Sequence, residues 1–477
     1  MPEGAGGIAA GVGDLDLRAA AALLRAGEAS SVELTAAYLE RIAALDGALS
    51  AWARTYPERA LAAARAADRR RAEGGSRGGL DGIPIGIKDT IAVAGLPRGL
   101  GSAAFAEEVA AIDAGAWARL REAGVVLVGH QQTQELAFGD APQLVANPWD
   151  PGRSPGGTSN GGAAAVAAGT VPAALGTDVG GSLRRPASAC GLTSFIATAG
   201  TVPLAGVHSF DRVSERVGPL ARSAADCSLV AAAIAAPFAS REAPAGPPGE
   251  PAAKPLRGVR CGRLVLREDQ VPAAPIAALV ARFEARLDEL GAEIVAVAPP
   301  AYPRLDPRPR PAHVAFFRAL PAVRRERLTA FTRRFGEELL RRAEREGTAD
   351  RGRDAAEVAR YRSAWARTFA EQRLDAVIAP GQVAETPLLA EVREEGDLER
   401  FGEPTIRTLW NLAGAPVVCL PAGRTEAGMP VGVQLAGPHH RDRALLRLAE
   451  AYQEATSDHE FQVAAGLGEG ALARSDT

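Results

Sequence analysis

The chain has 477 residues, of which 47% are hydrophobic and 23% are charged, so it contains ample apolar sequence for a large core. Its formal net charge of −3 at pH 7 argues against a general attraction to nucleic acid or to anionic membranes. No basic segment followed by an apolar run opens the sequence, and no apolar stretch is long enough to span a bilayer. We therefore expect a cytoplasmic protein with no nucleic-acid partner and no membrane contact.

Cysteine and histidine usage gives no sign of a metal site. The six histidines form no H-x-x-x-H or similar pair, and the cysteines lack metal-ligand spacing. The four cysteines are Cys190, Cys227, Cys261 and Cys419. We expect them to be reduced thiols in the core of a cytosolic protein, and we expect neither a metal ion nor another cofactor.

The N-terminal region, residues 15–75, is predicted to be helical. Ser30 and Glu33 form a capping-box pattern ahead of an amphipathic run over 34–45. A second run, rich in alanine and arginine, ends at two glycines, residues 74–75, where a helix is expected to stop.

The next part of the chain alternates between strand and helix patterns. Apolar segments predict strands at 83–87, 125–128 and 171–175. Helices are predicted between them, at 117–123 and 163–168. This alternation is typical of an α/β sheet.

A segment rich in proline, alanine and glycine, residues 236–255, is expected to be an exposed loop. The alternation then resumes, with strands predicted at 259–265 and 293–297 and an amphipathic helix predicted at 276–290.

Residues 312–373 are predicted to form a helical excursion from the sheet, within a single domain that covers residues 1–477. Their many arginines alternate with glutamates, and alternating signs favour a solvated helix face over a nucleic-acid patch. A tail from residue 464 is expected to fray. The remaining predicted elements are strands at 377–379, 417–420 and 431–435 and a helix at 443–455.

Two glycine-dense turns lie within residues 154–191, at 156–162 and at 180–181. Glycine permits positive φ and close approach of the backbone to a ligand. Thr158 lies in the first turn and Ser182 directly follows the second. From this pattern alone, two tight loops of an α/β protein and a site where N–H groups face a ligand are equally good interpretations.

Lysine usage adds another residue to this pattern. The sequence has 54 lysines and arginines together, and the only lysines are Lys88 and Lys254. Arginine cannot lose its proton in a protein, whereas a buried lysine can. Because Lys88 ends the apolar run D-G-I-P-I-G-I-K, we expect it to be buried with a lowered pKa. Lys254, in P-A-A-K-P, is interpreted as a solvated surface residue.

These motifs resemble the amidase signature family, which uses a Ser–cis-Ser–Lys triad. The most specific match is G-T-D-V-G-G-S-L-R at 176–184, and the lysine segment, N-P-W-D and V-G-P agree with it. Near the C-terminus, W-N-L-A-G-A-P-V-V-C-L-P-A-G and M-P-V-G-V-Q-L-A-G also look like family segments. The resemblance covers nearly the whole chain, more weakly from about 236 to 381. It implies an α/β/α sandwich with one large, mixed and twisted β-sheet.

The resemblance implies a nucleophile at Ser182 and a base at Lys88. A structural ion pair between Lys88 and Asp89 is the alternative interpretation of the lysine. Backbone N–H groups would stabilise the oxyanion, because glycines let the chain curl around an oxygen. The residues that would supply these N–H groups are Val179, Gly180, Gly181 and Ser182.

Two further residues flank the nucleophile, Asp178 and Arg184. The resemblance implies that they form an ion pair that braces the loop and takes no part in the chemistry. Removal of either charge would leave a buried partner unpaired.

The middle serine of the family falls on Thr158 here. Its hydroxyl can donate and accept at once, so it can pass a proton from Ser182 to Lys88, and we expect the Gly157–Thr158 peptide to be cis. The extra methyl group restricts χ1, so a working relay, a slow relay and a lost activity all remain open. Ser159 is the competing candidate for the relay, and Asn160 replaces a glycine that is usual in the family.

We therefore predict an amidase that hydrolyses the C–N bond of a linear small-molecule amide through an acyl-enzyme on Ser182, as a homodimer without cofactor. An A-type amidotransferase subunit with a protein partner is ranked lower, because the segment after Gly200 lacks a Ser-Arg-Tyr-Gly run. A degenerate amidase-fold binding protein is the third possibility, supported only by Thr158 and Asn160. No basic cluster in the segments expected to line the pocket calls for an anionic substrate.

Overall fold

The structure is a computed structural model, and it describes residues 11–138, 141–142, 144–235, 254–393 and 406–460. Within these ranges, eleven strands form one sheet in the order β1-β3-β2-β4-β6-β5-β10-β11-β9-β7-β8. The strands are β1 Trp52–Thr55, β2 Pro84–Lys88, β3 Val126–Gln131, β4 Ala173–Asp178, β5 Thr193–Ile196, β6 Arg216–Ala221, β7 Arg260–Leu264, β8 Glu293–Val297, β9 Ala376–Pro380, β10 Val417–Arg424 and β11 Pro430–Ala436.

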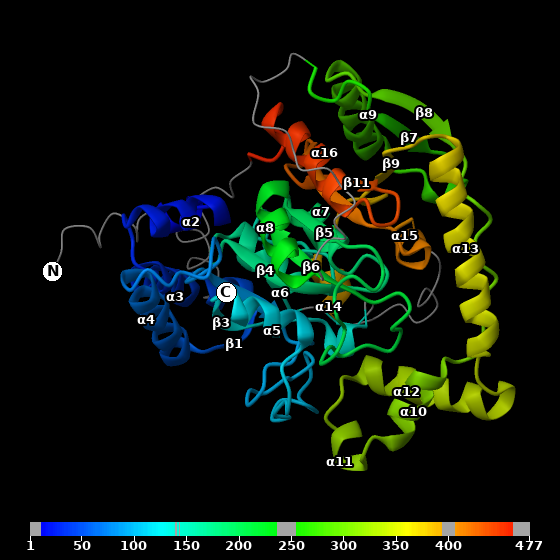
Figure 1. The fold of residues 1–477 in the computed structure, drawn as a ribbon. Helices are drawn as coiled ribbons and strands as arrows, with labels where there is room; N and C mark the ends of the chain where they lie inside the picture. The colour runs from blue at the N-terminus through cyan, green and yellow to red at the C-terminus, as the bar shows by residue number, and fades with distance from the viewer. Residues whose placement is uncertain (1–10, 139–140, 143, 236–253, 394–405, 461–477) are drawn as a thin grey trace.

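The sheet is mixed. Strand β2 runs parallel to both β3 and β4, and β7 runs parallel to β8 and β9. The central strands β4, β6, β5, β10 and β11 pair antiparallel with their neighbours in that order. The sheet runs from the N-terminal helices at the left of Figure 1 to β7 and β8 at the upper right.

Helices pack on both faces of the sheet. The α-helices are α2 Leu17–Ala26, α3 Ser31–Leu49, α4 Pro57–Ala72, α5 Gly115–Glu122, α6 Asn160–Ala167, α7 Arg184–Cys190, α8 Ala224–Ile234, α9 Ala274–Glu289, α10 Pro311–Ala319, α11 Ala322–Arg325, α12 Ala330–Glu346, α13 Arg351–Glu371, α14 Leu389–Arg393, α15 Thr408–Ala413 and α16 Asp442–Glu454. Three 3₁₀ turns also occur in the described residues: η1 Val12–Asp14, η2 Glu135–Ala137 and η3 Glu268–Gln270.

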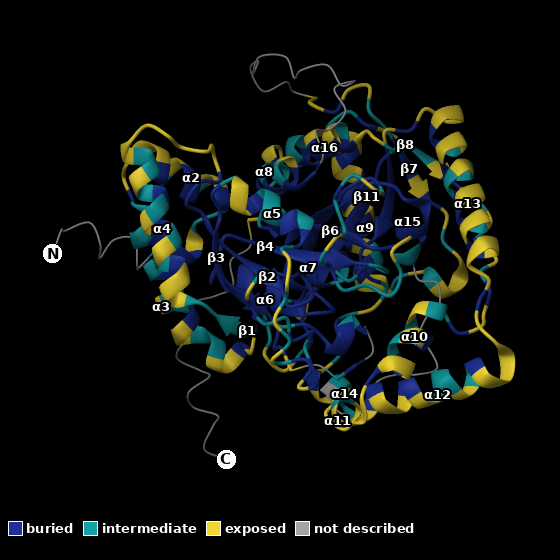
Figure 2. Ribbon diagram, turned by 60° about the horizontal axis from the view of Figure 1, so that its bottom comes forward, coloured by how far each residue is buried: buried dark blue, intermediate teal, exposed yellow. Residues whose placement is uncertain are grey.

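Alternate side chains of each central strand enter different cores, as the period of two in a strand requires. In β4, Ala173 and Leu175 join a core with helices α5, α8, α9 and α16, whereas Ala174 joins a second core with α6 and α7. The central strands of the sheet and the helices α6 and α7 are buried, whereas α4, α12 and α13 expose one face (Figure 2). The predicted α/β/α sandwich around one large mixed sheet is thereby confirmed.

Local signals in the sequence account for much of this arrangement. Ser30 caps α3 with the predicted capping box, in which its side chain accepts from the Glu33 N–H and Glu33 accepts from the Ser30 N–H. Helix α4 ends at Ala72, shortly before Gly74, whose positive φ of 72° is the left-handed conformation expected where a helix stops. The four cysteines are free and buried, as expected, and Lys254 is exposed.

Three strands are absent from the sequence-based prediction. Strand β1 lies within the region predicted to be helical, and its pairing with β3, as the edge strand of the sheet, overrides the surrounding helical pattern. Strands β5 and β6 escape a periodicity search because β5 is short and β6 contains Gly218 and Pro219. Glycine is required at position 218, because a Cβ there would lie 1.9 Å from the Phe195 carbonyl oxygen.

The helical excursion predicted at 312–373 contains α10, α11, α12 and α13, and it extends from the sheet at the lower right of Figure 1. Helices α10 and α12 contact the loops near Phe105 and Phe138 through an aromatic cluster, in which Phe138 and Phe335 have centroids 4.9 Å apart. Trp365 of α13 contacts Trp410 of α15, with centroids 4.9 Å apart. The excursion is thus tied to the segment that carries α15.

Two sequence-based expectations concern residues outside the described ranges. The loop predicted at 236–255 lies almost wholly there, and the tail from residue 464 lies there completely. Among the residues that are described, no helix is long and apolar enough to cross a membrane.

Candidate active site

Lys88 and Thr177 meet because their strands are parallel neighbours. Lys88 is the last residue of β2 and Asp178 is the last residue of β4, and β2 and β4 run in the same direction. The carboxyl ends of parallel strands are where α/β proteins place their ligands. Both glycine-dense turns reach this edge, one before α6 and the other between β4 and α7.

Lys88 is fully buried and donates two hydrogen bonds. Its Nζ lies 2.6 Å from Thr158 Oγ1 and 2.9 Å from Thr177 Oγ1. Burial lowers the pKa of Lys88 below that of a free lysine, although the carboxylates of Glu215 and Asp178 partly offset this effect. The lysine is therefore held next to two hydroxyl groups with its neutral form favoured.

Asp89 faces away from this lysine. Its carboxylate accepts from the N–H groups of Gly99 at 3.0 Å and Gly101 at 3.3 Å. Among the described residues no ion pair joins Asp89 to Lys88. The alternative interpretation of Lys88 as the partner of Asp89 is therefore wrong.

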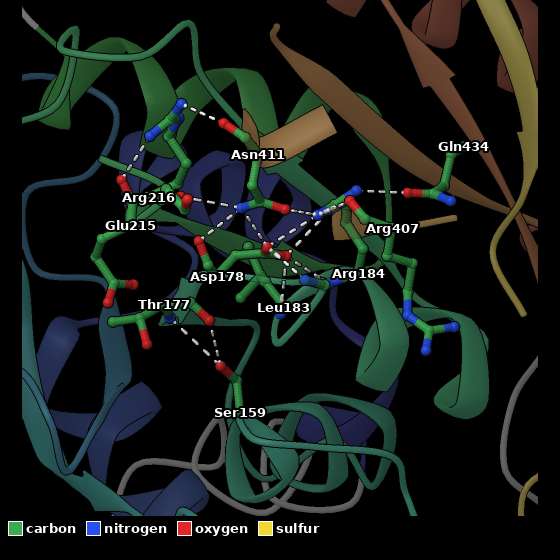
Figure 3. Close-up of polar contacts among 12 residues, drawn as sticks. Ser159, Thr177, Asp178, Leu183, Arg184, Glu215, Arg216, Arg407, Asn411 and Gln434 are labelled. Atoms are coloured by element: carbon green, nitrogen blue, oxygen red, sulfur yellow. Dashed lines mark hydrogen bonds and ion pairs between the residues drawn. The ribbon is translucent and has the colours of Figure 1, made fainter. Parts of the chain in front are cut away.

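Thr158 and Ser159 have different surroundings although they are adjacent. Thr158 turns its hydroxyl to Lys88, and its carbonyl accepts from Thr133 Oγ1 at 2.9 Å. Ser159 instead donates to the Thr177 carbonyl at 3.1 Å and accepts from the Thr177 N–H at 3.3 Å, as Figure 3 shows. The Gly157–Thr158 peptide is cis, as expected. The structure thus brings Thr158 to the lysine and holds Ser159 on β4.

Ser182 lies in a partly exposed turn that follows a buried strand. Val179, Gly180 and Ser182 are partly exposed, whereas β4 before them is buried. Within the described part of the chain, the Ser182 hydroxyl makes no hydrogen bond, either to Thr158 or to any other residue. Catalytic hydrogen bonds are often long before a substrate binds.

The N–H groups of the second turn fall into two sets. Gly181 donates to Asp178 Oδ1 at 2.8 Å, so its N–H is already occupied. The N–H groups of Val179, Gly180 and Ser182 find no protein acceptor among the described residues. Three of the four N–H groups expected to form an oxyanion hole are therefore available.

Asp178 and Arg184 form the expected ion pair, and both side chains are fully buried. Arg184 Nη2 lies 2.9 Å from Asp178 Oδ1, and Nε lies 3.1 Å from Oδ2. The carboxylate also accepts from the N–H groups of Leu183 and Arg184. Burial alone would raise the pKa of Asp178, but the Arg184 guanidinium and these hydrogen bonds outweigh it and hold that pKa well below its usual value.

Two residues from the C-terminal part complete this network (Figure 3). Asn411 donates to Asp178 Oδ1 at 2.9 Å and accepts from Arg184, while Gln434 Oε1 accepts from Arg184 Nη1 at 2.6 Å. Neither residue was singled out from the sequence, although both lie in the family-like segments W-N-L-A-G and V-G-V-Q-L-A-G. The network ties the turn before Ser182 to α15 and β11.

Glu215 is the functional candidate that sequence reasoning missed entirely. It directly precedes β6, is 3% exposed, and its Oε1 has no hydrogen-bond partner among the described residues. Burial raises the pKa of Glu215, and the nearby charge of Lys88 partly offsets this. No motif marks this glutamate, because only the pairing of β4 with β6 brings it near the end of β2.

Comparison with known proteins identifies the family of this chain. Residues 33–446 match the family model described as Amidase. The chain belongs to the amidase family.

Relatives of this amidase-family chain include proteins with two kinds of name. It is 36% identical to the A subunit of glutamyl-tRNA(Gln) amidotransferase from Chloroflexus aggregans, over 93% of this chain and 97% of that protein. It is 35% identical to the protein of the same name from Myxococcus xanthus, over 94% and 98%. The crystal structure of the native peptide amidase from Stenotrophomonas maltophilia superposes with a TM-score of 0.74 and 28% identity, over 93% of this chain and 97% of that one.

A cavity is present near the helical excursion. It has a volume of about 580 Å³ and lies between the loop 209–214 and the helices α10 and α13. Its lining includes Phe210, Arg310 and Val358 but neither Lys88 nor Ser182. Among the described residues no cluster of His, Cys, Asp and Glu that would hold a metal ion occurs.

Proposed function

We propose that this amidase-family protein hydrolyses the C–N bond of a linear small-molecule amide through an acyl-enzyme on Ser182. The observation that carries the proposal is the placement of a buried lysine with a lowered pKa against the Thr158 hydroxyl, at the edge where the Ser182 turn begins. An amide carbonyl is a poor electrophile, so its hydrolysis requires an activated nucleophile.

In the first step, Ser182 Oγ attacks the amide carbonyl carbon while its proton passes to the Thr158 hydroxyl, whose own proton passes to neutral Lys88. The carbonyl oxygen becomes an oxyanion, which the free N–H groups of Val179, Gly180 and Ser182 would stabilise. Their position in a loop braced by the Asp178–Arg184 pair supports this role, because a fixed loop needs no reorganisation when charge develops.

In the second step, the C–N bond breaks and the nitrogen leaves as an amine after it takes a proton back from Lys88 through Thr158. Water then attacks the ester carbon and gives its proton to the same relay. The products are a carboxylic acid and an amine, and Lys88 returns to its neutral form. The relay runs through Thr158 because Ser159 is committed to the Thr177 backbone.

A second function is favoured by the names of the curated relatives. Proteins that share 35–36% identity over more than nine-tenths of this chain are amidotransferase A subunits. We propose this activity as the alternative, in which the same acyl-enzyme step releases ammonia for a partner instead of into water. The Ser182 chemistry is common to both functions, and they differ in the acceptor and in the need for a partner protein.

Two experiments separate these functions. A fluorophosphonate probe should label the purified wild-type protein at Ser182, as located by peptide mass spectrometry, and should not label Ser182→Ala. Absence of labelling would favour a degenerate binding protein. The native chain, purified from its source with associated proteins, distinguishes the two active forms. A stoichiometric partner together with amidation of glutamyl-tRNA supports the amidotransferase, and partner-free turnover of small amides supports the amidase.

A further inference from the structure

Arg407 lies against the turn that carries the nucleophile. It directly precedes α15, and its side chain covers Gly181, the neighbour of Ser182. A methyl group on Gly181 would lie 2.6 Å from Arg407 Cδ and 2.9 Å from Nε. The glycine, which has a positive φ of 106°, thus allows the arginine to approach the reactive serine closely.

The guanidinium of Arg407 has no counter-charge among the described residues. Its Nη1 donates to the Gly381 carbonyl at 3.3 Å, while its buried Nε has no acceptor. Figure 3 shows the guanidinium apart from the Asp178–Arg184 network. A buried donor of a charged group is costly to leave without a partner. This arginine is therefore held, with unused donors, where its charge is not neutralised.

Neighbouring arginines make the electrostatic potential at Arg407 more positive. Asp178, the carboxylate that acts on Arg407, already pairs with Arg184. Burial, together with the charges of Arg185 and Arg184, lowers the pKa of Arg407 to about 9. These surroundings destabilise the charged form of Arg407. Binding of an anion therefore lowers the free energy more at this arginine than at an exposed one.

Arg407 contacts the turn at Gly181, and both the arginine and the turn are partly accessible. Arg407, Val179, Gly180 and Ser182 are each partly exposed, whereas Gly181 between them is buried. Because the Arg407 side chain covers Gly181, the residue directly before Ser182, a ligand held at Ser182 lies close to this arginine. Arginine presents a planar fork of donors that matches a carboxylate.

We propose that Arg407 binds a carboxylate of the substrate, so that the amides hydrolysed at Ser182 are those that carry a carboxylate near the scissile bond. This inference rests on the proposed acyl-enzyme function and narrows its substrate class to monoamides of dicarboxylic acids and related amide acids. It departs from the expectation that the substrate is not anionic, which considered only basic clusters in other segments. The sequence did not reveal Arg407, because it is one of many arginines and only the fold places it beside Gly181.

The test compares two amides that differ only in charge. Succinamate and succinamide, and glutaramate and glutaramide, are the monoamide and diamide of one acid, and ammonia release gives kcat/KM for each. We expect wild type to prefer the monoamides. Arg407→Met should lower kcat/KM for the monoamide by about 10–100-fold, the worth of a hydrogen-bonded charge pair, and leave the diamide nearly unchanged. Arg407→Lys should recover part of the preference.

The control variant is Arg119→Met, which removes a half-buried arginine that donates to the Ile234 carbonyl far from the turn. It should leave the ratio of monoamide to diamide unchanged. If Arg407 has a purely structural role, Arg407→Met should lower kcat/KM equally for the monoamide and the diamide. The ratio of the two kcat/KM values would then stay unchanged, and that outcome would overturn the proposal.

A measurement on the wild-type protein covers the case in which the Arg407 variants fail to fold. Succinate and glutarate should slow fluorophosphonate labelling of Ser182 at concentrations at which the diamides do not. Equal effects of acids and diamides would refute carboxylate binding while leaving the nucleophile intact. Absence of labelling in wild type would instead remove the proposed function, and this inference with it.

Discussion

The Nζ atom of Lys88 lies 2.6 Å from Oγ1 of Thr158, a residue 70 positions later in the chain, and both side chains are buried. The contact joins the end of β2 to the turn before α6. Because the lysine also donates to Thr177 at 2.9 Å, its ammonium position is fixed by two hydroxyl groups. A neutral lysine in this position has a hydroxyl partner ready to deliver a proton.

The first prediction tests whether Lys88 acts as a base or only as a charge. Lys88→Arg should lower kcat/KM nearly as much as Lys88→Ala, because arginine keeps the charge but cannot accept a proton. Lys254→Arg, at an exposed position, is the matched control and should retain full activity. Substantial activity of Lys88→Arg would show that only the positive charge is required.

The second prediction concerns pH. Because burial lowers the pKa of Lys88, kcat/KM should rise with pH as the lysine loses its proton, with an apparent pKa well below the value of about 10.4 for a free lysine. The groups that act on this lysine are Glu215 and Asp178, whose charges raise its pKa. His208 also interacts with it, but burial lowers the pKa of that histidine to about 3, so it is neutral over this range.

Glu215→Gln tests the direction of the electrostatic effect on Lys88. Loss of the carboxylate removes an attraction that favours the charged lysine, so the rising limb of the profile should move to lower pH. Asp226→Asn, which changes another buried acid on α8, should leave the limb in place. A limb that stays in place in Glu215→Gln, or moves to higher pH, would contradict the electrostatic coupling between the two residues.

The third prediction concerns stability. Arg184→Met leaves Asp178 buried without its partner, so the free energy of unfolding should fall by about 3–5 kcal/mol. Adding Asp178→Asn should recover part of this loss, since the uncompensated charge is gone. Urea unfolding followed by tryptophan fluorescence measures both changes. A loss below about 1 kcal/mol for Arg184→Met, the range of surface pairs, would show that the pair is not needed to brace the loop.

The lowered pKa of Asp178 predicts how the stability difference between wild type and Arg184→Met depends on pH. A carboxylate with a depressed folded pKa stabilises the fold above its unfolded pKa of about 3.9. That stabilisation is lost only as the pH falls through the lower folded value. The contrast between wild type and Arg184→Met should therefore be fully present at pH 7 and shrink in strong acid.

Those parts of the fold that depend on local patterns were predictable from the sequence. The capping box at Ser30 and the strand at 293–297 are local signals, and both occur as expected. Strand β6 was not predictable, because Gly218 and Pro219 disfavour a strand and only tertiary pairing with β4 and β5 places it.

The residues of the candidate site were likewise only partly predictable from the sequence. Lys88, Thr158 and Ser182 lie in motifs, so a resemblance identified them. Glu215 and Arg407 lie in no motif, and only contacts with residues far away in the chain, such as that between Arg407 and Gly181, bring them to the candidate site. A single sequence carries no record of such contacts. Ser159 shows the converse, since sequence alone could not separate it from Thr158, whereas its bonds to Thr177 do.

The last prediction isolates the hydroxyl of Thr158. Thr158→Val removes the oxygen that accepts from Lys88 at nearly constant shape, so kcat should fall by about 10²–10⁴-fold, as for other proton-transfer groups. Thr158→Ser keeps the oxygen and should retain activity. Rates on one amide substrate, measured at a pH above the rising limb, compare these variants with Lys88 in its neutral form.

Ser159→Ala is the matched control for this prediction, because it removes a neighbouring hydroxyl without touching Lys88. Its hydrogen bonds to the Thr177 backbone suggest a modest loss of stability of about 1 kcal/mol, with activity reduced far less than in Thr158→Val. If Ser159→Ala is inactive and Thr158→Val is fully active, the relay runs through Ser159 after a shift of the turn. If neither variant loses activity, Lys88 receives the proton by a route without either hydroxyl, and the proposed relay is wrong although Ser182 could still be the nucleophile.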